Sequence, residues 1–255
     1  MINLKIKNLI EGKIFKSNNC GNFKVLEYNG TFNVVIEFLQ TGYIYTTSYS
    51  NIKRGAVHDP YYPSVYNTGY FGIGKYKSRP DGGKQTVCYK RWKEMINRCY
   101  NPKCSSYNRY GGRGIKISNE WKNFQNFAEW WEENCINENF CLDKDILIKN
   151  NKIYSSETCC FVPPEINVLF TLRSYYRGEF PIGVKKSKYD TKYIAQIMKF
   201  GKKHGLGRFD TPEEAFLAYK KAKESYIKEI ADLYKPQISD KVYTALYNYE
   251  VEIDD

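Results

Sequence analysis

The sequence predicts an α+β protein with a small N-terminal antiparallel β-module, a central ββα domain with flanking helices, and a C-terminal three-stranded sheet with one helix. Three observations predict this class. Apolar and polar residues alternate in the first 57 residues, helical spacing dominates on both sides of residue 110, and two alternating segments precede a long helical pattern after Gly183. Because strand and helix patterns largely occupy separate segments, an α+β arrangement is expected.

The N-terminal module is expected to span residues 1–57 and to form a small barrel. Strand patterns at 23–28 and 32–38 flank Asn29-Gly30, a strong signal for a hairpin turn, and a third strand pattern covers 43–49. Residues 58–83 are rich in Pro, Gly, Tyr and Lys without periodicity, which predicts a basic linker.

The central domain is expected to span residues 84–175. Apolar residues share one face of a predicted helix at 88–100, a glycine-rich loop covers 107–114, and a short strand at 115–117 precedes a second helix at 121–133. Two further strands, separated by a turn at 149–151, lead into a helix from Pro164. This order predicts a ββα unit.

The C-terminal domain is expected to span residues 180–250. Its helix should begin with Thr211 as the cap, Pro212 at the first helical position and Glu214 closing a capping box. Helical spacing then predicts a buried face made of Ala215, Ala218, Tyr219, Ala222, Tyr226, Ile230 and Leu233.

Composition points to a globular protein with an anionic partner. Hydrophobic residues make up 42% of the 255 residues, and the formal net charge is +11. Such an excess of positive charge favours nucleic acid as the partner. The first residues do not resemble a signal peptide and no segment has the apolar length of a membrane span, so a cytoplasmic protein without a membrane partner is expected.

The eight cysteines do not indicate a metal site. They form no Cys-x-x-Cys pair, and the chain contains only two histidines, His58 and His204. Because structural zinc is normally held by two closely spaced ligand pairs, we expect reduced thiols that are mostly buried.

The C-terminal segment resembles the ethylene-response-factor (Apetala-type) DNA-binding domain, which also occurs in nucleases of phages and mobile elements. The resemblance is carried by Gly183-Val184, Lys192-Tyr193, Ala195, Ile197, Leu206-Gly207, Phe209-Asp210-Thr211, Glu213-Glu214-Ala215 and Ala218-Tyr219. It implies that the exposed face of the sheet enters the major groove of double-stranded DNA. The candidate contacts are Lys185, Lys186, Lys188, Lys192, Gln196, Met198 and Lys203. Lysines, Met198 and Tyr193 stand where arginines and tryptophan are usual in that family, and lysine lacks the fork with which arginine recognises guanine.

The central segment resembles phage-type HNH endonucleases. The resemblance is carried by Arg91-Trp92, Met95, Arg98-Cys99, Tyr107, Tyr110 to Ile115, Trp121, Phe124, Phe127, Leu142 to Asp145, Tyr154, Cys159 to Phe161 and Asn167. It implies a divalent-metal-dependent DNA endonuclease or nickase with one ion, Mg²⁺, in a ββα fold and a histidine that activates water.

The residues matched to this motif lack its histidine. Asp143 and Asn167 stand where metal ligands are expected, with Asp145 nearby, and Lys144 occupies the histidine position. Thr158 replaces the middle asparagine. Lysine is protonated at neutral pH, so a phosphate contact is expected of Lys144 rather than base catalysis. In the Tyr110 to Gly114 loop, Arg113 is the candidate for a second phosphate contact.

Several functions remain open at this point. A divergent nuclease could recruit His58 or another outside group as base, whereas an inert one would keep the ββα unit only as a DNA clamp. The carboxylates could also be ordinary surface groups at a strand end. Two alternatives belong to other functional classes. One is a phage effector that binds and inhibits a host protein, and the other is a non-cleaving DNA-binding regulator.

Overall fold

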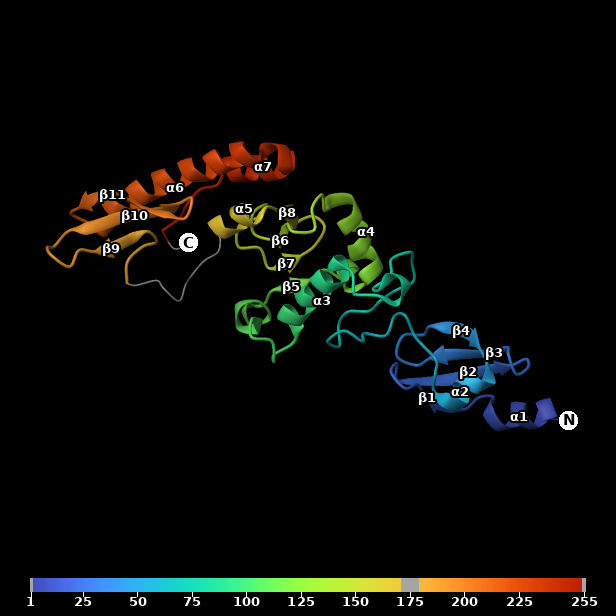
Figure 1. Cartoon of the computed structure of the whole chain (residues 1–255). Coiled ribbons are helices and arrows are strands. Elements are labelled where there is room, and N and C mark those ends of the chain that lie inside the picture. Colours follow the sequence, from blue (N-terminus) through green and yellow to red (C-terminus); the bar gives the residue numbers. More distant parts are fainter. Residues whose placement is uncertain (1, 171–178, 254–255) are drawn as a thin grey trace. The chain divides into compact units, whose positions relative to one another are not determined.

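The structure, a computed structural model, describes residues 2–170 and 179–253 (Figure 1). Helices and strands occur in separate groups, which confirms the α+β class. The chain divides into two compact units, Met1–Asn134 with Lys152–Ser155, and Cys135–Asn151 with Ser156–Asp255. The predicted division into 1–57, 58–83, 84–175 and 180–250 stays a prediction, and its boundary at 175 lies outside the described residues.

The first unit begins with a four-stranded antiparallel sheet in the order β1-β2-β3-β4. Its strands are Ile14–Lys16 (β1), Asn22–Tyr28 (β2), Val34–Phe38 (β3) and Ile44–Thr47 (β4). Two helices that the sequence analysis did not anticipate flank the sheet, Ile2–Ile10 (α1) and Tyr49–Arg54 (α2). In the described chain β1 and β4 are sheet edges, so the module is an open meander and the expected barrel closure is not seen.

The hairpin predicted at Asn29-Gly30 is present, but its loop is longer than expected. The Asn29 N–H donates to the Asn33 carbonyl, and β3 therefore begins at Val34 and not at Phe32. Phe32 lies in the loop with 86% of its surface exposed. Alternate residues of β2 and β3 are buried, which places the core of the module on one face of the sheet.

The segment 58–83 is irregular, as predicted, but it packs against the helices that follow it. A single short 3₁₀ turn, Pro80–Gly82, was found in its described part. The Gln125 side chain donates hydrogen bonds to the carbonyls of Phe71 and Tyr76. These bonds satisfy backbone groups that have no strand partner, and they tie the segment to the central helices.

The central helices are Val87–Tyr100 (α3), capped by Thr86, and Phe124–Asn134 (α4). Trp121, predicted as the start of the second helix, lies instead in the 3₁₀ turn Glu120–Lys122. The glycine-rich loop consists of two more 3₁₀ turns, Tyr107–Arg109 and Gly111–Arg113. The short strand Lys116–Ile117 (β5) pairs in parallel with Ile153–Tyr154 (β7).

The second unit contains the predicted ββα segment. Cys141–Asp143 (β6) pairs antiparallel with Cys160–Val162 (β8), and the helix Pro164–Leu169 (α5) begins at the predicted proline. All eight cysteines of the chain are free thiols.

The second unit continues with a three-stranded antiparallel sheet in the order β11-β10-β9. Its elements are Val184–Lys186 (β9), Tyr193–Lys199 (β10), Lys202–Phe209 (β11), the long helix Pro212–Tyr234 (α6), the 3₁₀ turn Lys235–Gln237 and the helix Asp240–Tyr247 (α7). The capping box of Thr211 and Glu214 at the start of α6 is confirmed.

One hydrophobic core joins the ββα segment to the C-terminal elements. It includes Ile146, Val162 and Ile166 together with Ile197 of β10 and a row of α6 side chains. On α6 the predicted Leu233 is instead 58% exposed, whereas the unpredicted Phe216, Ile227 and Ala231 are buried. Helices α5 and α7 both pack against α6, so its buried face extends beyond the side that covers the sheet.

A partly buried lysine links α6 to α5. The Lys223 ammonium donates a hydrogen bond to the Leu169 carbonyl (Nζ–O 3.0 Å). Burial lowers the pKa of Lys223 from 10.5 to about 8, since an ammonium is less stable away from water. Above this folded pKa and below 10.5, the unfolded chain binds the proton more tightly, so the free energy of unfolding rises with pH.

We therefore expect the wild-type protein to gain roughly 2–3 kcal/mol relative to Lys223→Met when the pH is raised from about 7 to about 10. Denaturant unfolding followed by circular dichroism at both pH values measures this difference. The other titrating groups are common to both proteins, so their contributions cancel when the two free energies of unfolding are subtracted. A wild-type to variant difference that does not change with pH would contradict the assignment.

Over the described residues, no helix has both the length and the apolar character needed to cross a membrane.

Candidate nucleic-acid interface

Strand β10 presents two different faces. Ala195 and Ile197 are buried, and the Lys199 ammonium lies 3.4 Å from the Glu229 carboxylate of α6. The odd-numbered positions of β10 therefore face α6. By alternation Ile194, Gln196 and Met198 point to the opposite side of the sheet.

The pairing of the strands extends this second face across the sheet. Ile194 of β10 stands between Lys185 of β9 and Arg208 of β11, and Met198 is paired with Lys203 of β11. Directly paired residues of antiparallel strands point to the same side. We define the free face of the sheet as Lys185, Ile194, Gln196, Met198, Lys203 and Arg208.

Four of the seven predicted DNA contacts thus lie together, namely Lys185, Gln196, Met198 and Lys203. The other three are placed differently. Lys186 is paired with Tyr193 on the edge strand β9, so its side chain points to the side of the sheet that faces α6. Lys188 is exposed in the loop between β9 and β10, and the Lys192 ammonium forms an ion pair with Asp210.

Arg208 joins the free face although sequence reasoning missed it. Strict alternation along β11 would place Lys203 and Arg208 on opposite sides, because five positions separate them. The register between β10 and β11 shifts at Ala195/Gln196, where Gly207 and Gly205 are successive partners and Leu206 is the extra residue. This β-bulge brings Arg208 to the same side as Lys203.

The Arg208 guanidinium is held in place by the β9–β10 loop. It forms an ion pair with Asp190 and donates a hydrogen bond to the Ser187 hydroxyl (3.2 Å). Desolvation acts to raise the pKa of Asp190, but hydrogen bonds from Lys192 N–H and Ser187 together with the Arg208 charge lower it below its ordinary value. By contrast, among the described residues neither Lys185 nor Lys203 forms an ion pair.

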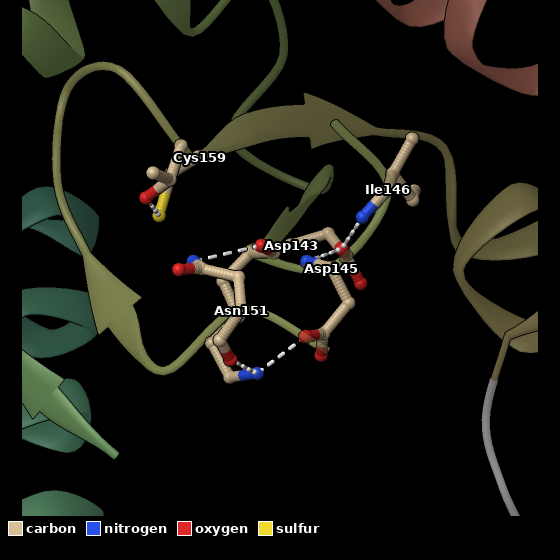
Figure 2. Close-up of polar contacts among 7 residues, drawn as sticks. Asp143, Asp145, Ile146, Asn151 and Cys159 are labelled. Atoms are coloured by element: carbon tan, nitrogen blue, oxygen red, sulfur yellow. Dashed lines mark hydrogen bonds and ion pairs between the residues drawn. The ribbon is translucent and has the colours of Figure 1, made fainter. Parts of the chain in front are cut away.

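The ββα segment holds the residues predicted to be catalytic. Figure 2 shows Asp143 at the end of β6, where its Oδ1 accepts hydrogen bonds from the backbone N–H groups of Asp145 (2.7 Å) and Ile146 (2.9 Å). Aspartate commonly stabilises a tight turn in this way. Burial raises the pKa of the Asp143 carboxyl, and these two hydrogen bonds oppose the rise only in part.

Lys144 is buried in the same turn, with 7% of its side chain exposed. Its ammonium donates to Asp145 Oδ1 (2.6 Å) and to the Asn151 carbonyl (2.7 Å), while the Asn151 amide donates to the Lys144 carbonyl (3.0 Å). These bonds close the turn from residue 144 to residue 151. The Lys144 ammonium is thus bonded within its own turn, and the phosphate contact expected of it stays a prediction.

The other predicted residues lie outside this turn. Asn167 lies in α5, the helix of the same ββα segment, which contacts β6, whereas Arg113 is exposed in the 3₁₀ turn Gly111–Arg113 of the first unit. His58, the alternative base, also belongs to the first unit, with its Nδ1 3.5 Å from Cys20 Sγ. Within the described part of the chain, no three His, Cys, Asp or Glu side chains are grouped as metal ligands would be. Mg²⁺ binding by Asp143 and Asn167 stays a prediction.

The turn predicts different effects for two substitutions of Asp143. Asn in its place keeps an oxygen that can accept both N–H groups, and it removes a partly buried charge. We expect Asp143→Asn to unfold within about 0.5 kcal/mol of the wild type, and Asp143→Ala to lose roughly 1–3 kcal/mol. Denaturant unfolding at neutral pH compares the two. Equal losses would show that the charge itself is required.

No protein-family model, curated protein or solved structure matches this chain.

Proposed function

We propose that this protein binds double-stranded DNA through the free face of its C-terminal sheet. The observation that carries the proposal is that Lys185 and Lys203, which form no ion pair among the described residues, lie together with the ion-paired Arg208 on one β-surface, opposite the helix that supports it. The formal net charge of +11 acts in the same direction, because a cationic surface releases counterions when it binds phosphates.

The shape of the surface suits the major groove, which admits a β-ribbon as well as a helix. Strands β10 and β11 form such a ribbon, and α6 packs on its other side. The resemblance of this segment to the Apetala-type domain, whose sheet enters the major groove, supports the same mode of binding.

DNA cleavage is not part of the proposal. Oδ1 of Asp143 and the Lys144 ammonium, the groups matched to the HNH motif, are bonded to their own turn. The core shared by Ile146, Val162 and Ile166 with the C-terminal elements instead favours the ββα segment as a support for the binding sheet.

Titration of a fluorescent duplex with the purified protein at several salt concentrations tests the proposal. We expect the logarithm of the binding constant to fall linearly with the logarithm of salt concentration. Affinity that does not change between low and physiological salt would refute an electrostatic interface. No binding to random duplex would instead favour a protein-binding effector.

Incubation of a supercoiled plasmid with Mg²⁺ or Mn²⁺ tests for cleavage in the same preparation. We expect the plasmid to be bound and to remain uncut. Nicking that Asp143→Asn abolishes would establish the metal-dependent endonuclease, since this variant is expected to keep the turn.

A further inference from the structure

The free face separates charged from neutral side chains. Its cationic residues, Lys185, Lys203 and Arg208, lie on the two outer strands β9 and β11. The middle strand β10 contributes Ile194, Gln196 and Met198, none of which is charged. A surface with this order can place cations beside the phosphates at the sides of a groove while its centre meets the base edges.

The centre of the face is open to close approach. Gln196 is paired with Gly205, which has no side chain, and a Cβ built at Gly205 would contact nothing within 4 Å. Met198 lies near the end of β10, beyond the part that pairs with β9, and is 54% exposed. The free face therefore presents an amide between two apolar side chains along β10, with Met198 exposed and Ile194 half-buried.

We propose that the free face reads A·T base pairs in the major groove, with Gln196 as the residue that recognises adenine and with Ile194 and Met198 contacting thymine methyl groups. The inference rests on the proposed binding of duplex DNA. A glutamine amide can donate one hydrogen bond to adenine N7 and accept one from the adenine N6 amino group. Apolar side chains can contact the thymine methyl group.

The same chemistry disfavours G·C pairs. Guanine presents two acceptors, O6 and N7, and is best recognised by the fork of an arginine. The arginine of this face, Arg208, already donates to Asp190 and Ser187. The lysines beside it are suited to phosphates as point charges.

Competition among three duplex pools tests the proposal. The pools share their flanks and differ in a randomised core that contains only A·T, only G·C, or only inosine·cytosine pairs. Inosine·cytosine resembles A·T in the minor groove, because it lacks the guanine N2 amino group, but resembles G·C in the major groove. We expect the A·T pool to bind roughly 5- to 100-fold tighter than either of the others.

A matched pair of variants assigns the preference to Gln196. Gln196→Ala should bind the A·T pool more weakly and lose most of the discrimination, with the slope of the salt dependence unchanged, whereas Gln237→Ala, an exposed glutamine of the same unit, should behave as the wild type. Equal binding to all three pools would overturn the inference and leave the proposed function intact. Tight binding of the inosine·cytosine pool would also overturn it, by indicating minor-groove readout. No binding to any pool would remove both proposals.

Discussion

Replacing Lys185 and Lys203 together with alanine is expected to lower the affinity for duplex DNA roughly tenfold at physiological salt. Both lysines are exposed on the free face, and no carboxylate among the described residues pairs with either. Each should release about one counterion when it meets a phosphate. The slope of the logarithm of the binding constant against the logarithm of the salt concentration should therefore become less negative by about two.

The control for this experiment removes the same charge from the other side of the C-terminal elements. Lys221 on α6 and Lys241 on α7 are exposed, and α7 packs against α6. Lys221→Ala with Lys241→Ala should leave affinity and salt dependence nearly unchanged. If both double variants weaken binding equally, net charge alone is responsible and the free face has no special role.

Substitution of Gly183 by alanine is expected to destabilise the second unit by roughly 3 kcal/mol or more. Gly183 precedes β9 with a φ of +79°, and a Cβ at this position would lie 2.0 Å from the ring of Tyr219. Tyr219 is only 6% exposed within the core under the sheet. The ring would have to move, and the strand that carries Lys185 would separate from α6.

Gly201→Ala isolates the steric part of this effect. Gly201 also has a positive φ, +73°, but a Cβ there would contact nothing within 4 Å. Only the cost of the left-handed backbone remains, about 1–2 kcal/mol. Denaturant unfolding followed by circular dichroism compares the two variants. Equal destabilisation would mean that the packing of Gly183 on Tyr219 does not matter for stability.

Local signals made much of the C-terminal fold predictable. The start of α6 depends on Thr211, Pro212 and Glu214, which act within four residues, and the structure shows the capping box as expected. The candidate contacts Gln196 and Met198, which the resemblance implied, lie two positions apart on β10 and therefore share one side of the strand.

Features that depend on distant partners were not predictable. The bulge at Leu206, which moves Arg208 to the free face, is defined by pairing with β10 and has no signature in β11 alone. Leu233 fits the helical spacing but is exposed, because the covered side of α6 depends on the sheet, α5 and α7, which all pack against it.

The ββα segment shows the same limit. In the sequence Lys144 is a charged residue beside two aspartates, which suggests a surface. Its burial follows from the closure of the turn by Asn151, seven residues away. A motif match cannot show whether a side chain is directed outward or bonded to its own backbone.

Lysine footprinting tests the central claim most directly. The protein is reductively methylated with and without a saturating random duplex, and mass spectrometry measures the modification of each lysine. The free face predicts strong protection of Lys185 and Lys203 and unchanged modification of Lys221 and Lys241. Protection of Lys221 and Lys241, with Lys185 and Lys203 still reactive in the bound protein, would contradict it.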